Sequence, residues 1–232
     1  MRIGPIHIPF KSIFRWLWRG VVFAFLAALL LVTLFAIVNP KGGIYMASER
    51  IRLGQIGHVW VDLEDMSAHV PRSVVAAEDA NFCNHYGIDF EELQKAIEGG
   101  GARGASTITQ QVAKNLFLWH GRSYLRKGLE AGFALLIETV WTKHRILEVY
   151  LNIAEFDEGV FGVGAASGVY YGTTVDQLGP EWSARLAAIL PNPKERSAAR
   201  PSAFVRKRTR AIMSGAGTIL ADGRSACFDV LE

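Results

Sequence analysis

Hydrophobic and polar positions divide the chain into an apolar N-terminal stretch and a longer part in which the two kinds of residue are mixed. From Gly20 to Val38 no residue is charged and nearly every position is apolar. A run of this length can cross the hydrocarbon core of a bilayer as one helix. A buried core helix would carry a polar stripe, and a cleaved signal peptide would have a shorter apolar stretch ending at a small-residue cleavage site. Neither feature is present in the sequence, so the pattern predicts a transmembrane helix over residues 20–38.

The rest of the chain shows mostly the spacing of amphipathic helices. After a linker or turn at Asn39–Gly43, alternation over His58–Leu63 indicates one short strand. Beyond it, apolar residues recur three and four positions apart, and capping residues precede several of these stretches. The predicted helices begin at Pro71, with Ser73–Asn84 as their continuation; at Asp89, to Ile97; at Ser106, to about Leu118; at Arg122, to Glu155, with a second start at Thr142; at Pro180, to Pro191; and at Ser202, to about Leu220. We therefore expect one mostly helical domain with little sheet.

Basic residues ahead of the apolar run predict its orientation. Arg2, Lys11, Arg15 and Arg19 precede it without an acidic residue among them, and the positive-inside rule keeps such a flank in the cytoplasm. Everything from about Pro40 onward is then expected outside. The net charge of +3 disappears when these four residues are set aside, because 21 basic and 22 acidic residues remain of the 25 and 22 in the whole chain. The outer part has no basic excess that would indicate a nucleic-acid partner.

The chain contains two cysteines, Cys83 and Cys227. An oxidising compartment would permit a disulfide between them, but their spacing does not require one. Two cysteines without histidines at suitable offsets cannot form a tetrahedral zinc site. We expect two unpaired or buried thiols.

The segment Glu78–Gly87 (EDANFCNHYG) places an acid at the edge of an apolar stretch. Glu78 follows Val74–Ala77, so its carboxylate loses solvation, which raises its pKa toward the range useful for proton transfer. His85 lies seven residues on and would share the face of Glu78 if the helix lasted that long. The same pattern also fits a solvated acidic face with a structural histidine, and the residues alone do not separate the two interpretations.

A second polar segment, Ala105–Phe117 (ASTITQQVAKNLF), follows a glycine-rich break. On a helix, Ser106, Gln110 and Lys114 align at four-residue steps, and Gln111 lies beside them. Hydroxyl, amide and ammonium groups presented together suit a polyhydroxylated or phosphorylated ligand. An ordinary capped helix with a wet face is the alternative.

Together the two segments resemble the first two signature motifs of the peptidoglycan glycosyltransferase family. In that family Glu-Asp-x-x-Phe-x-x-His-x-Gly precedes Gly-Gly-Ser-Thr-Ile-Thr-Gln-Gln; here Ala105 replaces the second glycine. Three more motifs follow in the family's order, at Arg126–Glu130 (RKGLE), Arg145–Asn152 (RILEVYLN) and Gly164–Gly172 (GAASGVYYG). Five motifs in order between about Pro71 and Gly172 are a strong signal, whereas any single one would be weak. The similarity extends to about Arg200 with the monofunctional, single-domain branch.

The resemblance implies a mainly α fold: a lysozyme-like helical glycosyltransferase domain with a small membrane-proximal lobe, preceded by one transmembrane helix. The domain limits predicted on this basis are a cytoplasmic segment 1–19, an anchor 20–38, a linker 39–60, the glycosyltransferase domain 61–221 and a tail 222–232. Localisation at the bacterial inner membrane, single-pass, with a periplasmic catalytic domain, follows from the anchor and its flanking charge.

The activity implied is polymerisation of lipid II, a disaccharide-peptide on undecaprenyl pyrophosphate. The hydroxyl of an incoming lipid II attacks the anomeric carbon of the growing chain, giving a β-1,4 link with inversion and releasing undecaprenyl pyrophosphate. The predicted partners are lipid II, the growing glycan chain, membrane lipid and other cell-wall synthesis proteins. Neither Ser-x-x-Lys nor Lys-Thr-Gly occurs, so no transpeptidase activity is expected.

Residue roles carry over position by position. Glu78 matches the family's general base, and Glu130 matches its second acid, on the donor side. Lys114 and Arg122 match the basic residues that hold the pyrophosphate. The other predicted substrate-binding residues are Ser106, Gln110, Gln111, Asn115, Arg126 and Lys127, the last two on the same positive wall. Asp79 and His85 are expected to be structural supports.

No cofactor and no metal site is required by the sequence, although the family allows a divalent cation, Mg²⁺ or Mn²⁺, at the pyrophosphate. Moenomycin-type phosphoglycolipids mimic the donor in this family. Three more segments carry expectations: Glu98–Gly104 as a mobile flap over the cleft, Leu116–Trp119 as either a lipid-facing or a core segment, and Arg206–Arg210 as either a headgroup-facing or a plain solvated surface.

Two rival functions remain at this stage. A glycan hydrolase of the lysozyme type would also be helical with an essential glutamate, but it has no need of the pyrophosphate-binding cations Lys114 and Arg122. A membrane-anchored scaffold that kept the fold and lost activity would be expected to lack Glu78 or Glu130, and both are present.

Overall fold

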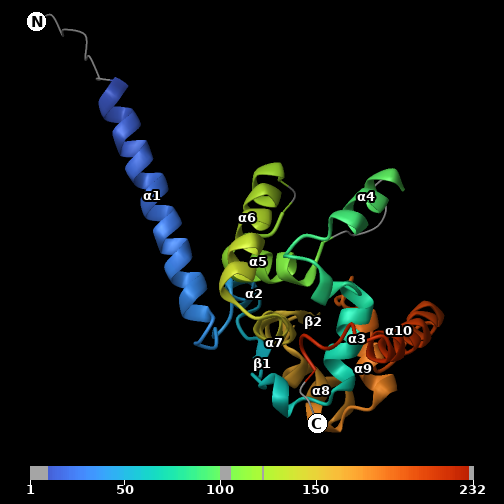
Figure 1. Ribbon diagram of the computed structural model, residues 1–232. Coiled ribbons are helices and arrows are strands. Elements are labelled where there is room, and N and C mark those ends of the chain that lie inside the picture. Colours follow the sequence, from blue (N-terminus) through green and yellow to red (C-terminus); the bar gives the residue numbers. More distant parts are fainter. Residues whose placement is uncertain (1–9, 100–105, 122, 230–232) are drawn as a thin grey trace, which may run out of the picture. The chain divides into compact units, whose positions relative to one another are not determined.

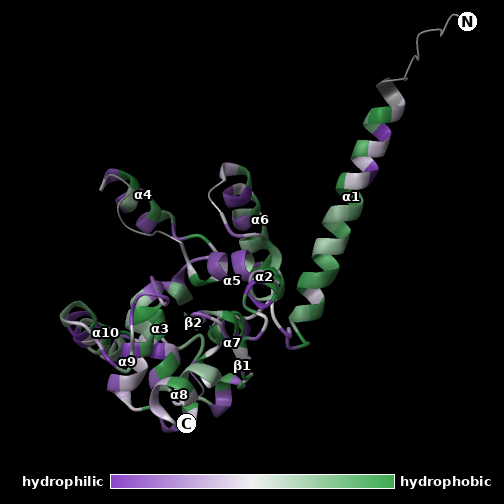
Figure 2. Ribbon diagram, turned by 180° about the vertical axis from the view of Figure 1, so that it is seen from behind, coloured by the Kyte–Doolittle hydropathy of each residue, from purple (hydrophilic) through white to green (hydrophobic). Residues whose placement is uncertain are grey.

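A computed structural model of the chain describes residues 10–99, 106–121 and 123–229. Its contacts group into two units, residues 1–39 and 40–232. The first unit holds helix α1, Phe10–Phe35. The stretch Ser12–Phe35 is long and apolar enough to cross a membrane, and only 6% of its most apolar window is buried, unlike a core helix. Figure 2 shows α1 as largely hydrophobic, with its hydrophilic residues toward the N-terminal end.

The helix differs from the predicted span 20–38 at both ends. It starts ten residues earlier than Gly20, because the basic and tryptophan residues ahead of the apolar run are compatible with a helix. It ends at Phe35, three residues before Val38, in a turn that leads to Asn39–Pro40. The N–H groups of Ala36 and Val38 still bond to the carbonyls of Val32 and Leu34, so the chain leaves the helix through a last turn before Pro40, which has no N–H to continue it.

The second unit is built from two groups of packed helices (Figure 1). In one, α3 (His69–Glu78), α9 (Pro180–Ile189) and α10 (Ala203–Ala221) pack against one another. In the other, α5 (Ile108–Phe117) packs against α6 (Tyr124–Val140), α7 (Lys143–Ile153) and α2 (Ile44–Leu53). The remaining helices are α4 (Phe90–Glu98), α8 (Val163–Tyr171) and the short 3-10 turns η1 (Leu63–Asp65), η2 (Phe82–Asn84) and η3 (Val175–Gln177). The mainly α, lysozyme-like fold expected from the sequence is confirmed.

A small three-stranded sheet lies beside these helices. Its order is β1 (Gly57–His58), β3 (Val160–Phe161), β2 (Glu155–Asp157), with β1 parallel and β2 antiparallel to β3. The predicted strand His58–Leu63 is wrong beyond His58. The Asn152 side chain accepts from the Val61 N–H at 2.9 Å and donates to the Val61 carbonyl at 2.8 Å, so it takes the place of a strand partner there.

Three helix starts that a capping residue announces in the sequence are confirmed, at Asp89, Thr142 and Ser202. The side chains of Asp89, Thr142 and Ser202 each accept from the backbone N–H three residues on, at 3.0, 3.1 and 3.3 Å. Pro180 occupies the first turn of α9 as expected. These local bonds satisfy backbone donors at the helix starts.

Three predicted helix boundaries are wrong. Helix α3 starts at His69, so Pro71 is third in it, and the helix ends at Glu78 instead of continuing to Asn84. His85 therefore does not share a helical face with Glu78. Thr107, not Ser106, caps α5, since its side chain accepts from Gln110 N–H while the Gln110 side chain accepts from Thr107 N–H. The stretch from Arg122 to Glu155 is divided between α6 and α7, and the start of α7 after Thr142 is as predicted.

The expectation of two unpaired thiols is wrong, because Cys83 and Cys227 form a disulfide. Their Cα atoms are 5.7 Å apart, within the usual range for this bond. Helix α10 packs along α3 and carries the C-terminal turn back to η2. The partners are 144 residues apart in sequence, so no local spacing announces the pair.

Candidate active site

Glu78 is the last residue of α3, and its side chain is only 13% exposed. Gln111 Nε2 donates to Glu78 Oε2 at 3.1 Å. The other oxygen, Oε1, is buried, accepts no hydrogen bond from the described residues, and lies 3.6 Å from Arg208 Nη2. Burial raises the pKa of Glu78, while Gln111, Arg208 and Lys114 act in the opposite direction. The site thus holds a desolvated carboxyl with one acceptor atom left for a ligand proton.

The residues after Glu78 hold the loop that follows it. Asp79 Oδ1 pairs with His85 Nε2 at 2.9 Å, and Asp79 Oδ2 accepts from the Ile108 N–H, at the start of α5, at 2.9 Å. Gly87 has φ of +76°, and a Cβ there would meet the Ala134 carbonyl at 3.1 Å, which explains the glycine of the motif. The first motif therefore joins the end of α3 to α5 and α6.

Asp79, His85 and Asp89 form the one group among the described residues whose ligand atoms, all within 4.8 Å of one another, could hold a metal ion. Sequence spacing did not indicate this group. Its carboxylates already serve the fold, since Asp79 binds His85 and a backbone N–H, and Asp89 caps α4 and accepts from Asn81 at 3.4 Å. The geometry agrees with the supporting role expected of Asp79 and His85.

The two adjacent glutamines of the second motif have different environments. Gln110 is 5% exposed and belongs to the cap of α5, so its amide oxygen is occupied within the protein. Gln111 links Tyr150 to Glu78, because Tyr150 Oη donates to Gln111 Oε1 at 3.2 Å and Gln111 Nε2 donates to Glu78. The tyrosine thereby fixes which end of the Gln111 amide faces the carboxylate. Burial raises the pKa of Tyr150, so this hydroxyl remains a donor.

A cationic wall runs along α5 and α6. Glu130 is 3% exposed and accepts from Arg126 Nη1 at 2.6 Å and from Lys127 Nζ. Lys127 also donates to Ser106 Oγ at 2.9 Å. Lys114 has no ion pair within 4 Å in the described part of the chain, and burial lowers its pKa. The structure therefore brings Ser106, Arg126, Lys127 and Glu130 into one network, with Lys114 close enough to feel their charges.

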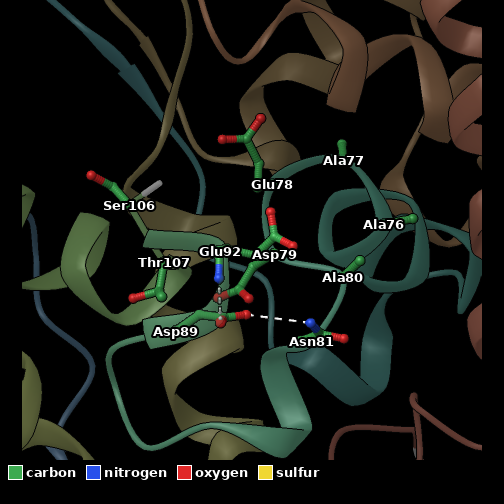
Figure 3. A pocket seen from close by; sticks show the side chains of 10 residues that line it. All are labelled: Ala76, Ala77, Glu78, Asp79, Ala80, Asn81, Asp89, Glu92, Ser106 and Thr107. Atoms are coloured by element: carbon green, nitrogen blue, oxygen red, sulfur yellow. Dashed lines mark hydrogen bonds between the residues drawn. The ribbon is translucent and has the colours of Figure 1, made fainter. Parts of the chain in front are cut away.

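Glu78 and Gln111, which share a hydrogen bond, line two different hollows. The first, about 280 Å³, is lined by Glu78, Asp79, Asn81 and Ser106 among others (Figure 3). The second, about 250 Å³, is lined by Gln111, Lys114, Asn115, Tyr150 and Lys194 among others. Asn115 Oδ1 in the second hollow is buried and has no partner among the described residues. The hydrogen bond between Glu78 and Gln111 therefore links the linings of two polar hollows.

Two features predicted from the sequence, Arg122 and most of the flap, lie outside the residues that the structure describes. Arg122 lies outside them, as do residues 100–105, which make up most of the predicted flap Glu98–Gly104. Within Leu116–Trp119, Leu116 and Leu118 are 4% and 3% exposed and belong to the core, whereas Trp119 is 47% exposed.

Arg208 is the residue that sequence reasoning missed. It lies in the basic stretch Arg206–Arg210, for which the sequence predicts a headgroup-facing or solvated surface, yet its Nη2 donates to the Ala77 carbonyl at 3.3 Å and lies 3.6 Å from Glu78 Oε1. A signal was present, since Arg208 adjoins the face formed by Val205, Thr209 and Ile212, all buried. An arginine beside a buried stripe points to an internal partner.

Proteins of known family match this chain along most of its length. A family model described as Transglycosylase matches residues 48–216. The biosynthetic peptidoglycan transglycosylase of Jannaschia sp. (strain CCS1) is 48% identical over 214 residues, covering 92% of this chain and 90% of the relative. The protein of the same description from Caulobacter vibrioides is 46% identical over 200 residues, covering 84% and 87%. That from Marinomonas sp. (strain MWYL1) is 50% identical over 157 residues, covering 66% and 70%.

Proposed function

The chain belongs to the transglycosylase family as a peptidoglycan transglycosylase, and on that premise we propose that it polymerises lipid II into β-1,4-linked glycan with inversion at the anomeric carbon. The observation that carries this proposal is the Glu78 carboxyl. It is buried, its Oε1 has no hydrogen bond from the described residues, it lines one polar hollow and bonds to Gln111 in the lining of another, and it lies near the wall of cations. Undecaprenyl pyrophosphate is the expected leaving group.

Glu78 acts as the general base. The acceptor hydroxyl lies against Oε1 and gives up its proton as its oxygen attacks the donor's anomeric carbon. Desolvation raises the pKa of Glu78, which strengthens it as a base, and Arg208 and Gln111 keep it ionised enough to accept a proton. A single displacement inverts the anomeric carbon and needs no covalent enzyme intermediate.

The wall of cations stabilises the leaving group. As the glycosidic bond breaks, charge grows on the pyrophosphate, and fixed cations placed where charge develops favour the transition state. Lys114 has no ion pair within 4 Å among the described residues, so its ammonium is available to the phosphate. Lys127 and Arg126 are held in place by Glu130, whose part in the reaction is to organise these two side chains. Ser106, Gln111 and Asn115 contact the sugars.

A divalent cation held by the protein does not fit this wall. The carboxylate of the wall itself is Glu130, and its two oxygens are bound by Arg126 and Lys127; Glu155, which lines the same hollow as Lys114, is bound by Tyr45 and the Gly159 N–H. Any Mg²⁺ or Mn²⁺ at the pyrophosphate would be held mainly by phosphate oxygens, and no step above uses one.

A lysozyme-type hydrolase is the rival, and the site disfavours it. Such an enzyme needs a carboxylic acid that protonates a sugar leaving group. It also uses a second carboxyl group at the scissile bond, and here both oxygens of Glu130 are bound by cations, Arg126 and Lys127. Cations suit a leaving group that departs as an anion and needs no proton.

We propose a single-pass location in the bacterial inner membrane with the catalytic unit in the periplasm. Helix α1 is compatible with an anchor, and basic residues flank its N-terminal end. The disulfide supports an oxidising compartment for residues 83 and 227. Exposed apolar side chains on α4 (Phe90, Leu93 and Ile97) and at the start of α6 (Tyr124 and Leu125) provide a surface for acyl chains.

The experiment that tests the base is Glu78→Gln, assayed on labelled lipid II. The substitution keeps the shape and an acceptor oxygen but cannot take a proton, so turnover should fall by about 10²–10⁴-fold with the fold unchanged. Glu158→Gln, a change at a surface acid, is the matched control. Near wild-type polymerisation by Glu78→Gln would end the assignment.

A further inference from the structure

The C-terminal segment Asp222–Asp229 folds back onto the loop that follows the catalytic glutamate. Cys227 is bonded to Cys83 in that loop, and Arg224 Nη1 donates to the Ala80 carbonyl at 3.2 Å. The ring of Phe228 lies 6.3 Å, centroid to centroid, from that of Phe82. The segment therefore contacts the loop through a covalent bond, a hydrogen bond and an apolar contact.

A fourth tie reaches the catalytic helix itself. Asp229 Oδ1 accepts from Arg72 Nε at 2.9 Å, and both side chains are largely buried. Phe82 and Phe228 are 0% and 1% exposed, so the contact between the segment and the loop is part of the core. Residues 222–229 lie beyond the stretch 48–216 that matches the family model, and none of the five motifs covers them.

The loop that these contacts hold, residues 79–84, begins immediately after Glu78. It has no regular ladder of backbone hydrogen bonds, apart from the single 3-10 turn η2. Asp79 within it carries the bonds to His85 and to the start of α5. A shift of this loop would move the end of α3, and with it the Glu78 carboxylate, relative to Gln111.

We propose that residues 222–229 form a clasp that positions Glu78 for catalysis, and that full turnover requires the Cys83–Cys227 bond to be closed. This proposal rests on the proposed function, in which Glu78 is the base. Cys83 and Cys227 are positioning residues, since they touch neither hollow. Because the bond forms only in an oxidising compartment, the clasp would also couple full activity to export of the domain.

If the clasp positions Glu78, opening it should lower kcat without weakening binding at the donor site. The contacts described for the segment go to α3 and to the loop, whereas the donor-side residues lie on α5 and α6. Opening the clasp should therefore slow the proton transfer while leaving the donor site intact. Misplacing a catalytic group by about 1 Å can cost on the order of a hundredfold in rate, so a fall in kcat of about ten- to a hundredfold is expected.

The test uses full-length protein in detergent, with kcat on lipid II and the Kd of a moenomycin-type phosphoglycolipid as paired readouts. Dithiothreitol reduces the bond in folded wild-type protein to two thiols and is itself oxidised to a cyclic disulfide. Cys227→Ser is the permanent open form, and Arg224→Ala removes the tie to Ala80 while keeping the disulfide. Treatment of Cys227→Ser with dithiothreitol controls for any other effect of the reductant.

We expect kcat to fall on reduction, to recover on reoxidation of the wild type but not of Cys227→Ser, and the inhibitor Kd to stay within about twofold. Arg224→Ala should show a smaller fall in kcat. Full turnover with both thiols free would overturn the clasp, and so would a parallel loss of kcat and inhibitor binding, which would mean that the bond only holds the fold. If Cys227→Ser fails to fold, reduction of the folded wild type gives the same comparison. Failure of the proposed function looks different: oxidised wild type makes no polymer, or Glu78→Gln remains active.

Discussion

Removing the charge of Arg208 should change the pH dependence of polymerisation. Arg208 Nη2 lies 3.6 Å from Glu78 Oε1. Two unit charges at that separation interact by about 1 kcal/mol at the dielectric of water and by about 5 kcal/mol at an effective dielectric of 20. The Arg208 side chain is 30% exposed, so solvent screens the pair and the lower end of this range applies, roughly 1–2 kcal/mol.

The direction of the expected change in the pH profile follows from the proposed role of Glu78 as a base. Burial raises the pKa of Glu78, and Arg208, together with Gln111 and Lys114, opposes that rise, while Asp79 adds to it. Arg208→Ala should therefore raise the pKa further, so that less of the base is ionised at low pH. We expect kcat on lipid II to fall by roughly tenfold on the acid limb, since about 1.4 kcal/mol corresponds to a factor of ten, and to approach the wild-type rate at alkaline pH.

The assay is the initial rate of polymerisation from about pH 5 to pH 9, with folding checked by circular dichroism. Arg208→Lys keeps the positive charge and should have most of the wild-type rate at acidic pH. Arg206→Ala is the matched control, because that arginine lies on the same helix but is exposed and donates to the Pro201 carbonyl. A profile for Arg208→Ala that superimposes on the wild-type profile would refute the electrostatic role of Arg208.

Two further predictions concern the donor site and the anchor. Lys114→Ala should lower both turnover and affinity for a moenomycin-type phosphoglycolipid by about 10²-fold, because a charge contact to the leaving group is lost. Lys207→Ala, a change at an exposed lysine, should alter neither quantity. Unaltered turnover and affinity in Lys114→Ala would place the pyrophosphate elsewhere. An alkaline phosphatase reporter fused after Glu232 should be active, because α1 is expected to keep its basic flank in the cytoplasm; an inactive phosphatase, with a fluorescent reporter active at the same position, would reverse the topology.

The features that could be predicted from sequence are those encoded locally. Asp89, Thr142 and Ser202 announce helix starts because a cap bonds to a backbone N–H three residues away. The motif acid Glu78 could be singled out because the apolar residues before it indicate burial, and the structure shows it buried. The spacing of Ser106 and Lys127 gives no hint of their hydrogen bond, but the motifs brought both residues into the predicted site.

The features that sequence did not predict depend on contacts between distant segments. Arg208 meets Glu78 across 130 residues, and Cys83 meets Cys227 across 144. The end of α3 at Glu78 depends on Asp79, whose carboxylate binds His85 and the start of α5 instead of facing solvent. The strand at His58 stops early because Asn152, far along the chain, binds the Val61 backbone. Periodicity reports burial along one helix and cannot report which helix lies opposite.

The most direct test of the central claim is to supply the purified protein with lipid II and, separately, with intact cell-wall sacculi. The account predicts that lipid II is converted into long, uncrosslinked glycan that lysozyme can digest, with one undecaprenyl pyrophosphate released for each bond formed, while the sacculi stay intact. Soluble muropeptides released from sacculi, with no polymer from lipid II, would contradict it and establish a hydrolase.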